Sequence, residues 1–245
     1  MTAPELSVVV LCYRGGHHIV PYVNDIVRLL AEANVEYEIV LVANYDIPEN
    51  FDLTPEIAAS LSAQNGRIVT VSEAKQGRMG WDLHRGLNAA HGRYIGFVDG
   101  DGETAAADII RLYTAVTAAK SEFGKMYRVR RADSRLRQTI SAAFNLLFSL
   151  CFPIARCRDI NGKPKILSAT ALARMQLTST DWFADAEIVL EAHRLGLVRT
   201  ELPCGGLRST WHTSFIGFSA VLEFTKNLLV YRIRYWFFRR RESSI

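Results

Sequence analysis

Three carboxylates separated by single glycines follow an apolar stretch in YIGFVDGDGE, residues Tyr94–Glu103. Glycine at positions 100 and 102 lets the backbone turn, so that Asp99, Asp101 and Glu103 can converge and a bulky anion can approach closely. Converging carboxylates repel each other unless a cation lies between them, and hard oxygen ligands suit Mg²⁺ or Mn²⁺. The stretch therefore predicts a metal site at these three acids, completed by phosphate oxygens of a ligand. The alternative is an acidic turn that only solvates the end of a strand.

The elements that must position these acids alternate along the first 120 residues. Apolar runs predict strands, and helical periodicity predicts helices between them, the last with Thr104 as its N-cap. This βα alternation predicts an α/β fold with a doubly wound, mostly parallel sheet, whose ligands bind beyond the carboxyl ends of the strands. The strands are expected at Leu6–Cys12, Glu38–Ala43, Arg67–Val71 and Arg93–Val98, and the helices at Ile19–Ala33, Thr54–Ala63, Gly80–Ala90 and Thr104–Lys120.

The second half of the chain is less regular. Lys125–Arg137 carries six basic residues and one acid. The nearly uncharged run Thr139–Ala155 is shorter than a membrane-spanning helix and contains Pro153. An amphipathic helix is expected at Trp182–Leu195, followed by a strand at Gly196–Leu202.

Composition narrows the class of protein. The 245 residues, 49% of them hydrophobic, suffice for one large α/β domain, and a net charge of +4 makes the surface only mildly basic. That charge does not indicate a nucleic-acid partner. The four cysteines lack CxxC or zinc-ligand spacing, which favours free thiols in a reducing compartment. The N-terminal stretch MTAPELSVVV does not have the pattern of a signal peptide.

The stretch GRYIGFVDGDGE, preceded by KQGRMGWDLHRGLNAAH, resembles the core of glycosyltransferase family 2, which has the GT-A fold. The first apolar run, LSVVVLCYRGG, is similar to the family's SVVIPCYNE, and the resemblance extends to about residue 215. The branch that it resembles most is that of the polyprenyl-phosphate sugar synthases, such as dolichol-phosphate mannose synthase. The resemblance implies a GT-A nucleotide-sugar-binding domain over residues 1–209 and a C-terminal amphipathic helix at the membrane interface over residues 210–245.

The resemblance also implies where the donor binds. Asp99 and Asp101 match the family's DxD motif, which holds the metal and the donor, and Glu103 is placed to be a third ligand. The family's acidic contact to the base is missing in LVANYD, at positions 43 and 44, unless Asn44 or Asp46 replaces it, and the identity of the base stays open. The turn after the first strand, Tyr13 and Arg14, implies contact with the nucleoside, and the loop at Lys75 and Gly77 lies beside the nucleotide.

Basic residues and further acids are implied for the phosphates and the acceptor. Arginines after the fifth strand match a region that flanks the diphosphate and the acceptor phosphate, although a solvated helix face is the alternative; they are Arg128, Arg130, Arg131 and Arg137. Asp159 and Lys163 are expected to face the site, and Arg208 to lie near the diphosphate. Asp159 and Arg208 are, with Asp185, the expected catalytic residues. Asp185 takes the place of a general base, although it could simply be an acid in the first turn of a helix. Glu187 matches a carboxylate of the polyprenyl-phosphate branch.

The resulting functional hypothesis is an inverting glycosyltransferase that moves one sugar from a nucleoside-diphosphate sugar to a polyprenyl (undecaprenyl or dolichyl) phosphate, with Mg²⁺ or Mn²⁺. One alternative is a family 2 transferase that acts on a sugar hydroxyl, and another is a non-catalytic homologue that binds nucleotide sugars. A phosphate acceptor is already anionic, whereas a hydroxyl needs a base. The role of Asp185 therefore separates the two acceptor classes.

A lipid acceptor implies contact with a membrane. The run Thr139–Ala155 and the C-terminal segment supply apolar surface, with Leu228 and Leu229 among its residues, and arginines such as Arg232 suit anionic headgroups. We expect peripheral attachment to the cytoplasmic face of the cell membrane. The alternatives are a buried core helix for the first segment and a packing helix for the second, and a homo-oligomer is compatible with both.

Overall fold

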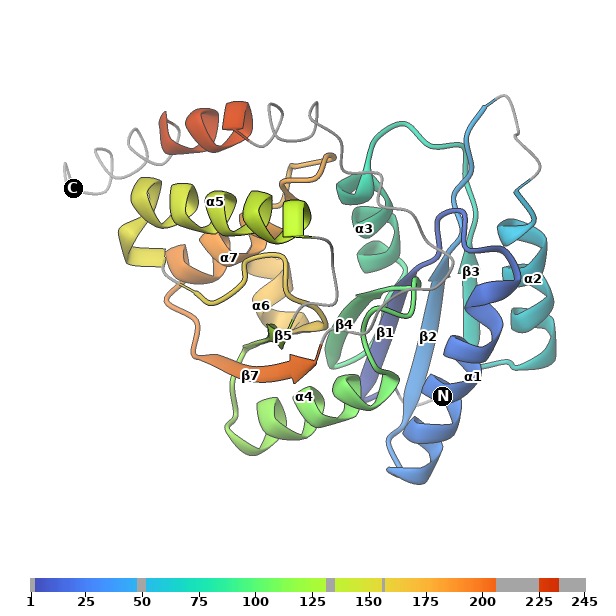
Figure 1. The fold of residues 1–245 in the computed structure, drawn as a ribbon. Helices are drawn as coiled ribbons and strands as arrows, with labels where there is room; N and C mark the ends of the chain where they lie inside the picture. Colours follow the sequence, from blue (N-terminus) through green and yellow to red (C-terminus); the bar gives the residue numbers. More distant parts are fainter. Residues whose placement is uncertain (1–2, 48–51, 131–134, 156, 206–224, 234–245) are drawn as a thin grey trace.

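The computed structural model describes residues 3–47, 52–130, 135–155, 157–205 and 225–233. Its centre is a seven-stranded sheet with helices on both faces (Figure 1). The strand order is β3-β2-β1-β4-β6-β5-β7. The strands are β1 (Leu6–Leu11), β2 (Tyr37–Val42), β3 (Ile68–Val71), β4 (Tyr94–Asp99), β5 (Phe123–Arg130), β6 (Lys165–Ser168) and β7 (Arg199–Gly205). The predicted α/β class and the mostly parallel sheet are confirmed.

Strand direction brings the functional segments together. β1 runs parallel to β2 and β4, and β2 runs parallel to β3. The carboxyl ends of these four strands therefore lie at one edge of the sheet. β6 is antiparallel to both β4 and β5. Since Phe97 near the end of β4 pairs with Lys165 at the start of β6, the segment before β6 reaches the same edge.

Alternation along the strands builds two apolar layers. Val8 and Val10 of β1 point to the face covered by α1 (Ile19–Glu32), α2 (Thr54–Gln64) and α4 (Ala106–Ala118). Val9 and Leu11 point to the other face, covered by α3 (Met79–Asn88), α5 (Arg135–Cys151) and α7 (Ala184–Arg194). Each fully buried valine stabilises the fold by about 1.5–3 kcal/mol. Short elements complete the fold: α6 (Ala169–Arg174) and the 3₁₀ turns Gly16–His18 and Pro153–Ala155.

Several expected boundaries differ from the structure by one to three residues, and two of these differences concern how a helix begins or ends. The N-cap of α4 is Ala105, without a side-chain hydrogen bond, rather than Thr104. The last strand begins at Arg199 instead of Gly196. Gly196 has a φ of 63° and ends α7, because its N–H donates to His193 and that of Leu197 donates to Ala192. These two bonds form a Schellman motif, for which glycine is the preferred residue.

The two apolar segments near the C-terminus are divided between core and surface. On α5, Phe148 is buried, whereas Leu146 and Leu150 are 63% and 70% exposed. Residues 225–233 are helical, and their Leu228 is buried in the same core, so its predicted place in an apolar surface was wrong. Leu229 is exposed, as expected. No helix in the described part of the chain is long and apolar enough to cross a membrane.

Candidate functional site

Asp99 is the last residue of β4, and the loop after it carries Asp101 and Glu103 at the carboxyl edge of the sheet. A Cβ at Gly100 would lie 3.1 Å from the carbonyl oxygen of Leu11, so the loop approaches β1 too closely for a larger residue. Gly102 has a φ of 73°, which disfavours any side chain there. Asp101 accepts a hydrogen bond of 2.9 Å from the backbone N–H of Glu103. The glycines therefore shape the acidic turn, as the sequence indicated.

Lys163 forms an ion pair with both carboxylate oxygens of Asp99. The Nζ atom of Lys163 lies 2.7 Å and 2.8 Å from the two carboxylate oxygens. The same Nζ lies 3.4 Å from Asp185, which also forms an ion pair with the fully buried Lys165. Lys163 therefore links the acidic turn after β4 to the first turn of α7.

The charged groups of this cluster shift one another's pKa values. Burial, and then the nearby Asp99 carboxylate, raise the pKa of Asp101 to about 7. Burial alone would raise the pKa of Asp185 too, but Lys163 and Lys165 outweigh it and hold this pKa below its ordinary value. Asp185 is only 3% exposed. A buried carboxylate neutralised by two ammonium groups is a weak base, so the geometry does not favour Asp185 as a general base.

The acidic turn can supply two carboxylates, Asp99 and Asp101, to a metal ion, rather than three that would surround it. Within the residues that the structure describes, no three carboxylate, imidazole or thiolate groups are placed to hold one ion. The trio of Asp99, Asp101 and Glu103 is therefore not assembled. A pair of carboxylates fits a divalent ion that takes its other ligands from a diphosphate and water, as Mg²⁺ usually does.

A second cluster surrounds the predicted nucleoside contacts. Asp46, after β2, accepts hydrogen bonds from Tyr13 Oη at 2.6 Å and from Arg14 Nη2 at 2.7 Å. The Nζ atom of Lys75 lies 3.9 Å from the centroid of the Tyr13 ring, a cation–π contact. Four residues predicted from three different loops thus lie side by side, and Asp46 is about one-third exposed.

Asp82, on the first turn of α3, is a member of this cluster that the sequence reading missed. It forms an ion pair with Lys75 and accepts a 2.9 Å hydrogen bond from Asn44. Asn44 also accepts the N–H of Glu73 at 2.8 Å and is fully buried. Of the two candidates for the missing base contact, Asn44 is therefore a support for the loops, and Asp46 is the exposed one. An acid seven residues after Lys75 was the available signal.

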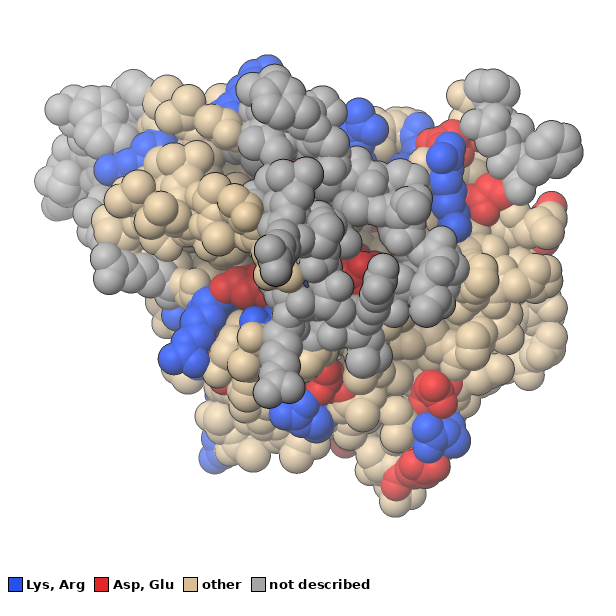
Figure 2. Space-filling view, viewed as in Figure 1, with Lys and Arg blue, Asp and Glu red and all other residues tan. Residues whose placement is uncertain are grey.

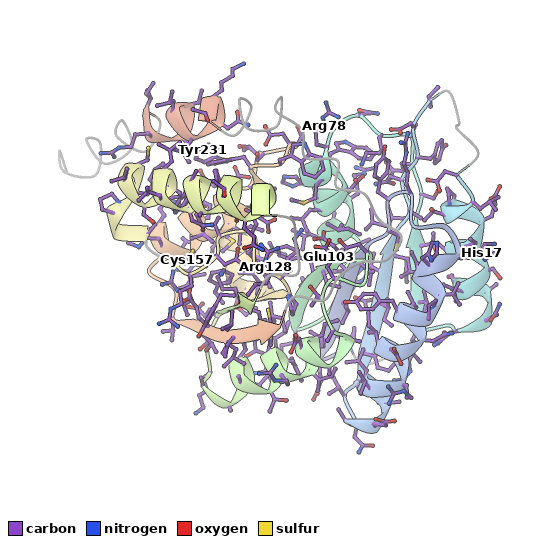
Figure 3. All side chains as sticks on the ribbon, in the orientation of Figure 1. His17, Arg78, Glu103, Arg128, Cys157 and Tyr231 are labelled. Carbon is purple, nitrogen blue, oxygen red and sulfur yellow. The ribbon has the colours of Figure 1, made fainter. Side chains whose placement is uncertain are left out.

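Arg128 and Asp159 form a closed pair at the end of β5. Arg128 lies within the strand rather than after it, as does Arg130, which corrects their predicted position. Nε and Nη2 of Arg128 donate to the two oxygens of Asp159 at 2.7 Å and 2.9 Å. Burial opposes ionisation of Asp159, but Arg128 outweighs it and lowers the pKa to about 2. Asp159 is therefore held as an anion that anchors Arg128. In Figure 3, Arg128 and Glu103 are both labelled near the centre of the view.

Gly77, before α3, and Glu187, on α7, both contact the loop that precedes α7. A Cβ at Gly77 would lie 2.9 Å from the carbonyl oxygen of Thr180, so this glycine allows the α3 entry to pack on residues 178–182. Glu187 accepts the backbone N–H groups of Thr178 and Ser179, both at 2.9 Å. Tyr231 packs its ring 4.8 Å from that of Phe183 and is labelled in Figure 3. Helix 225–233 is thereby attached to the same loop region.

The structure does not describe the side chains of four predicted arginines, of which Arg130 lies on β5. Arg131 and Arg208 lie outside the described residues, and Arg137 is on α5 without a described side chain. Their phosphate-binding roles stay predictions. Figure 2 shows charged side chains of both signs on the described surface around this face.

The fold is shared with solved glycosyltransferases. Glucosyl-3-phosphoglycerate synthase from Mycobacterium tuberculosis, in complex with Mn²⁺, UDP-glucose and phosphoglyceric acid, is 16% identical, with a TM-score of 0.73 over 94% of this chain and 80% of that chain. Mannosyl-3-phosphoglycerate synthase from Rubrobacter xylanophilus is 15% identical, with a TM-score of 0.72 over 94% of this chain and 74% of that chain. None of the curated proteins matches this chain in sequence. The structural likeness assigns the chain to the GT-A fold.

The family follows from the sequence model and the fold together. The model of "Glycosyl transferase family 2" matches residues 7–174, which span β1, the acidic turn and β6. That range includes the DGDGE turn and the Tyr13, Asp46 and Lys75 cluster, which the structure places along one edge of the sheet. The chain belongs to glycosyl transferase family 2.

Proposed function

We propose that this family 2 glycosyltransferase moves a single sugar from a nucleoside-diphosphate sugar to a polyprenyl phosphate, with inversion at the anomeric carbon. An oxygen of the acceptor phosphate forms the new bond to the anomeric carbon, and the bond from that carbon to the nucleoside diphosphate breaks. The observation that carries this proposal is the state of Asp185, which is buried and neutralised by Lys163 and Lys165. An acceptor that is already anionic needs no base.

The described residues can be assigned to the nucleoside, the metal ion and the phosphates of this reaction. Tyr13, Arg14 and Asp46 form the exposed part of the cluster on which the nucleoside would lie. Asp99 and Asp101 would hold Mg²⁺ or Mn²⁺, which, when bound, supplies positive charge to the departing diphosphate. Arg128, fixed by Asp159, would contribute charge near the phosphates, together with Arg131, Arg137 and Arg208 in the proposal.

Attachment to the membrane face is part of the same proposal. Leu146 and Leu150 are spaced one helical turn apart on α5, and Leu229 and Ile233 are spaced likewise on helix 225–233. All four side chains are more than half exposed. Cys151 at the end of α5 lies within electrostatic range of Arg232, so the two helices adjoin. Exposed apolar residues on two adjoining helices, together with the basic Arg232, suit a bilayer interface that contains anionic lipid.

The test is transfer of radiolabelled sugar from UDP- and GDP-sugars to undecaprenyl phosphate, measured in the organic phase with and without Mn²⁺. Parallel reactions contain a free monosaccharide or phosphoglyceric acid, which is present in the complex of the M. tuberculosis enzyme. The proposal expects label in the lipid fraction, dependent on Mn²⁺ and lost in Asp101→Ala. Label that enters only a hydroxyl acceptor, and that requires Asp185, would support the alternative transferase class.

A further inference from the structure

The ammonium group of Lys163 lies at the acidic turn, beside the carboxylate of Asp99, where a metal ion would also have to bind. Its Nζ lies 2.7 Å and 2.8 Å from the two oxygens of Asp99, so both are engaged by one ammonium. The Lys163 side chain is 8% exposed, whereas that of Asp99 is 40% exposed. The lysine therefore approaches Asp99 from the protein side, and the open side of the carboxylate faces away from it.

A second partner for this ammonium lies close by. Asp185 is 3.4 Å from the same Nζ and is already paired with Lys165. The lysine stands between an exposed carboxylate of the metal-binding turn and a buried carboxylate of α7. A small movement of its flexible side chain would exchange the first partner for the second without leaving the ammonium unpaired in a buried place, which would be costly.

Two cations cannot both be held closely by one carboxylate without strong repulsion. A divalent ion on Asp99 would stand within a few ångströms of the Lys163 ammonium, where repulsion between like charges is large in a partly buried site. Either the ion or the ammonium must give way. The anionic neighbourhood of Asp101 favours the ion, because that carboxylate has no ammonium at hydrogen-bond distance among its described contacts.

We propose that Lys163 is an internal counter-cation that neutralises Asp99 while no metal is bound, and that a divalent ion displaces it towards Asp185. Lys163 is thus a positioning residue that sets the affinity of the turn for metal and prevents repulsion between Asp99 and Asp101 in the empty site. The inference rests on the proposed metal role of Asp99, and it adds a competition that the proposed function does not require.

The experiment measures Mn²⁺ binding directly, without sugar donor or acceptor, by the loss of the electron paramagnetic resonance signal of free Mn²⁺. Lys163→Gln removes the competing charge and is expected to bind Mn²⁺ at least about tenfold more tightly than the wild type, a factor worth about 1.4 kcal/mol. The matched control is Lys120→Gln, which removes an exposed lysine just beyond the C-terminal end of α4 and should bind like the wild type. Equal or weaker binding by Lys163→Gln overturns the inference.

A second measurement uses the wild-type protein and does not depend on the folding of a variant. Acylation of lysines by an N-hydroxysuccinimide ester, followed by peptide mass spectrometry, is compared with and without Mn²⁺. Release from Asp99 is expected to change the labelling of Lys163 at least about twofold, while Lys120 stays labelled and the fully buried Lys165 stays unlabelled in both states. Unchanged labelling of Lys163 at saturating Mn²⁺ overturns the inference.

The two proposals fail differently. If the wild type binds Mn²⁺ but Lys163→Gln binds it no more tightly, only the competition is wrong, and Asp99 keeps its proposed ligand role. If neither protein binds Mn²⁺, with or without added UDP, both the competition and the metal part of the proposed function are wrong.

Discussion

Arg128 donates three hydrogen bonds to the carboxylate of Asp159: from its backbone N at 3.1 Å, from Nε at 2.7 Å and from Nη2 at 2.9 Å. Asp159 itself has a φ of 47°, a left-handed conformation that aspartate and asparagine tolerate better than most residues. The carboxylate of Asp159, which was predicted to be catalytic, is therefore engaged by Arg128. We expect a substitution of Asp159 to change the stability of the protein.

The ion pair of Arg128 and Asp159 makes the free energy of unfolding depend on pH. The pKa of Asp159 falls from an ordinary value of 3.8 to about 2, because Arg128 outweighs burial. The unfolded chain binds this proton first as the pH falls, so the stabilisation is complete above about pH 4 and is lost as the pH falls through the folded pKa. We expect wild type to lose about 2 kcal/mol more than Asp159→Asn between pH 5 and pH 2. Urea unfolding followed by circular dichroism measures the difference, and parallel curves for the two proteins would contradict it.

The buried pair of Asp185 and Lys165 predicts a compensating double substitution. Asp185→Asn leaves the fully buried Lys165 without its carboxylate and should lower the free energy of unfolding by about 3–5 kcal/mol. Asp185→Leu with Lys165→Met removes both charges and should recover most of that loss, since apolar residues of similar size can replace a buried ion pair. Denaturant titration of the three proteins measures this. A double variant that is less stable than Asp185→Asn would refute the pairing.

Asp46 should affect nucleotide binding more than stability. It is the partly exposed acid that Tyr13 and Arg14 both contact. Asp46→Ala releases both side chains and should weaken binding of UDP or GDP by about tenfold, the size of effect expected for a charge-assisted hydrogen bond. Calorimetric titration measures the change, with Asp25→Ala on α1 as an exposed control. Undiminished affinity for both nucleotides would place the nucleoside elsewhere.

Gly80 should be intolerant of any side chain, although alanine is the better helix former. A Cβ there would lie 2.4 Å from the carbonyl oxygen of Ser179 and 2.6 Å from that of Asp181. Backbone atoms cannot move aside cheaply, so Gly80→Ala should cost about 2 kcal/mol or more. Gly66→Ala, where nothing lies within 4 Å, is the matched control and should be neutral or slightly stabilising. Thermal unfolding of the two variants compares them, and equal melting temperatures would disprove the close approach.

The exposed apolar residues on α5 and on helix 225–233 should determine binding to vesicles. Leu150→Ser with Ile233→Ser removes one residue from each helix, where the side chains are 70% and 58% exposed. Flotation with vesicles of phosphatidylcholine and phosphatidylglycerol is expected to fall at least about fivefold, because each leucine or isoleucine contributes about 1.5–3 kcal/mol when buried. Leu53→Ser removes an exposed leucine before α2 and serves as the control. Flotation that is equal in all three proteins would argue against this membrane face.

Local pattern in the chain determined the class of the fold and most of its elements. Continuous apolar runs such as Leu6–Leu11 can only be stable when both faces are covered, and this requirement produced the correct prediction of a doubly wound sheet. The DGDGE turn was recognisable because glycine spacing and charge are properties of adjacent residues. The same reasoning failed at Gly196, where a glycine that ends a helix was taken as the start of a strand.

Only the tertiary structure decided the partners of each charge. Lys163 and Asp99 are 64 positions apart, and Arg128 and Asp159 are 31 apart. Asp82 and Lys165 gain their importance from neighbours on other elements. A sequence shows which charges exist, whereas their protonation and availability depend on burial and on the nearest opposite charge. Asp185, an apparent base in the sequence, therefore became one member of a buried ion pair.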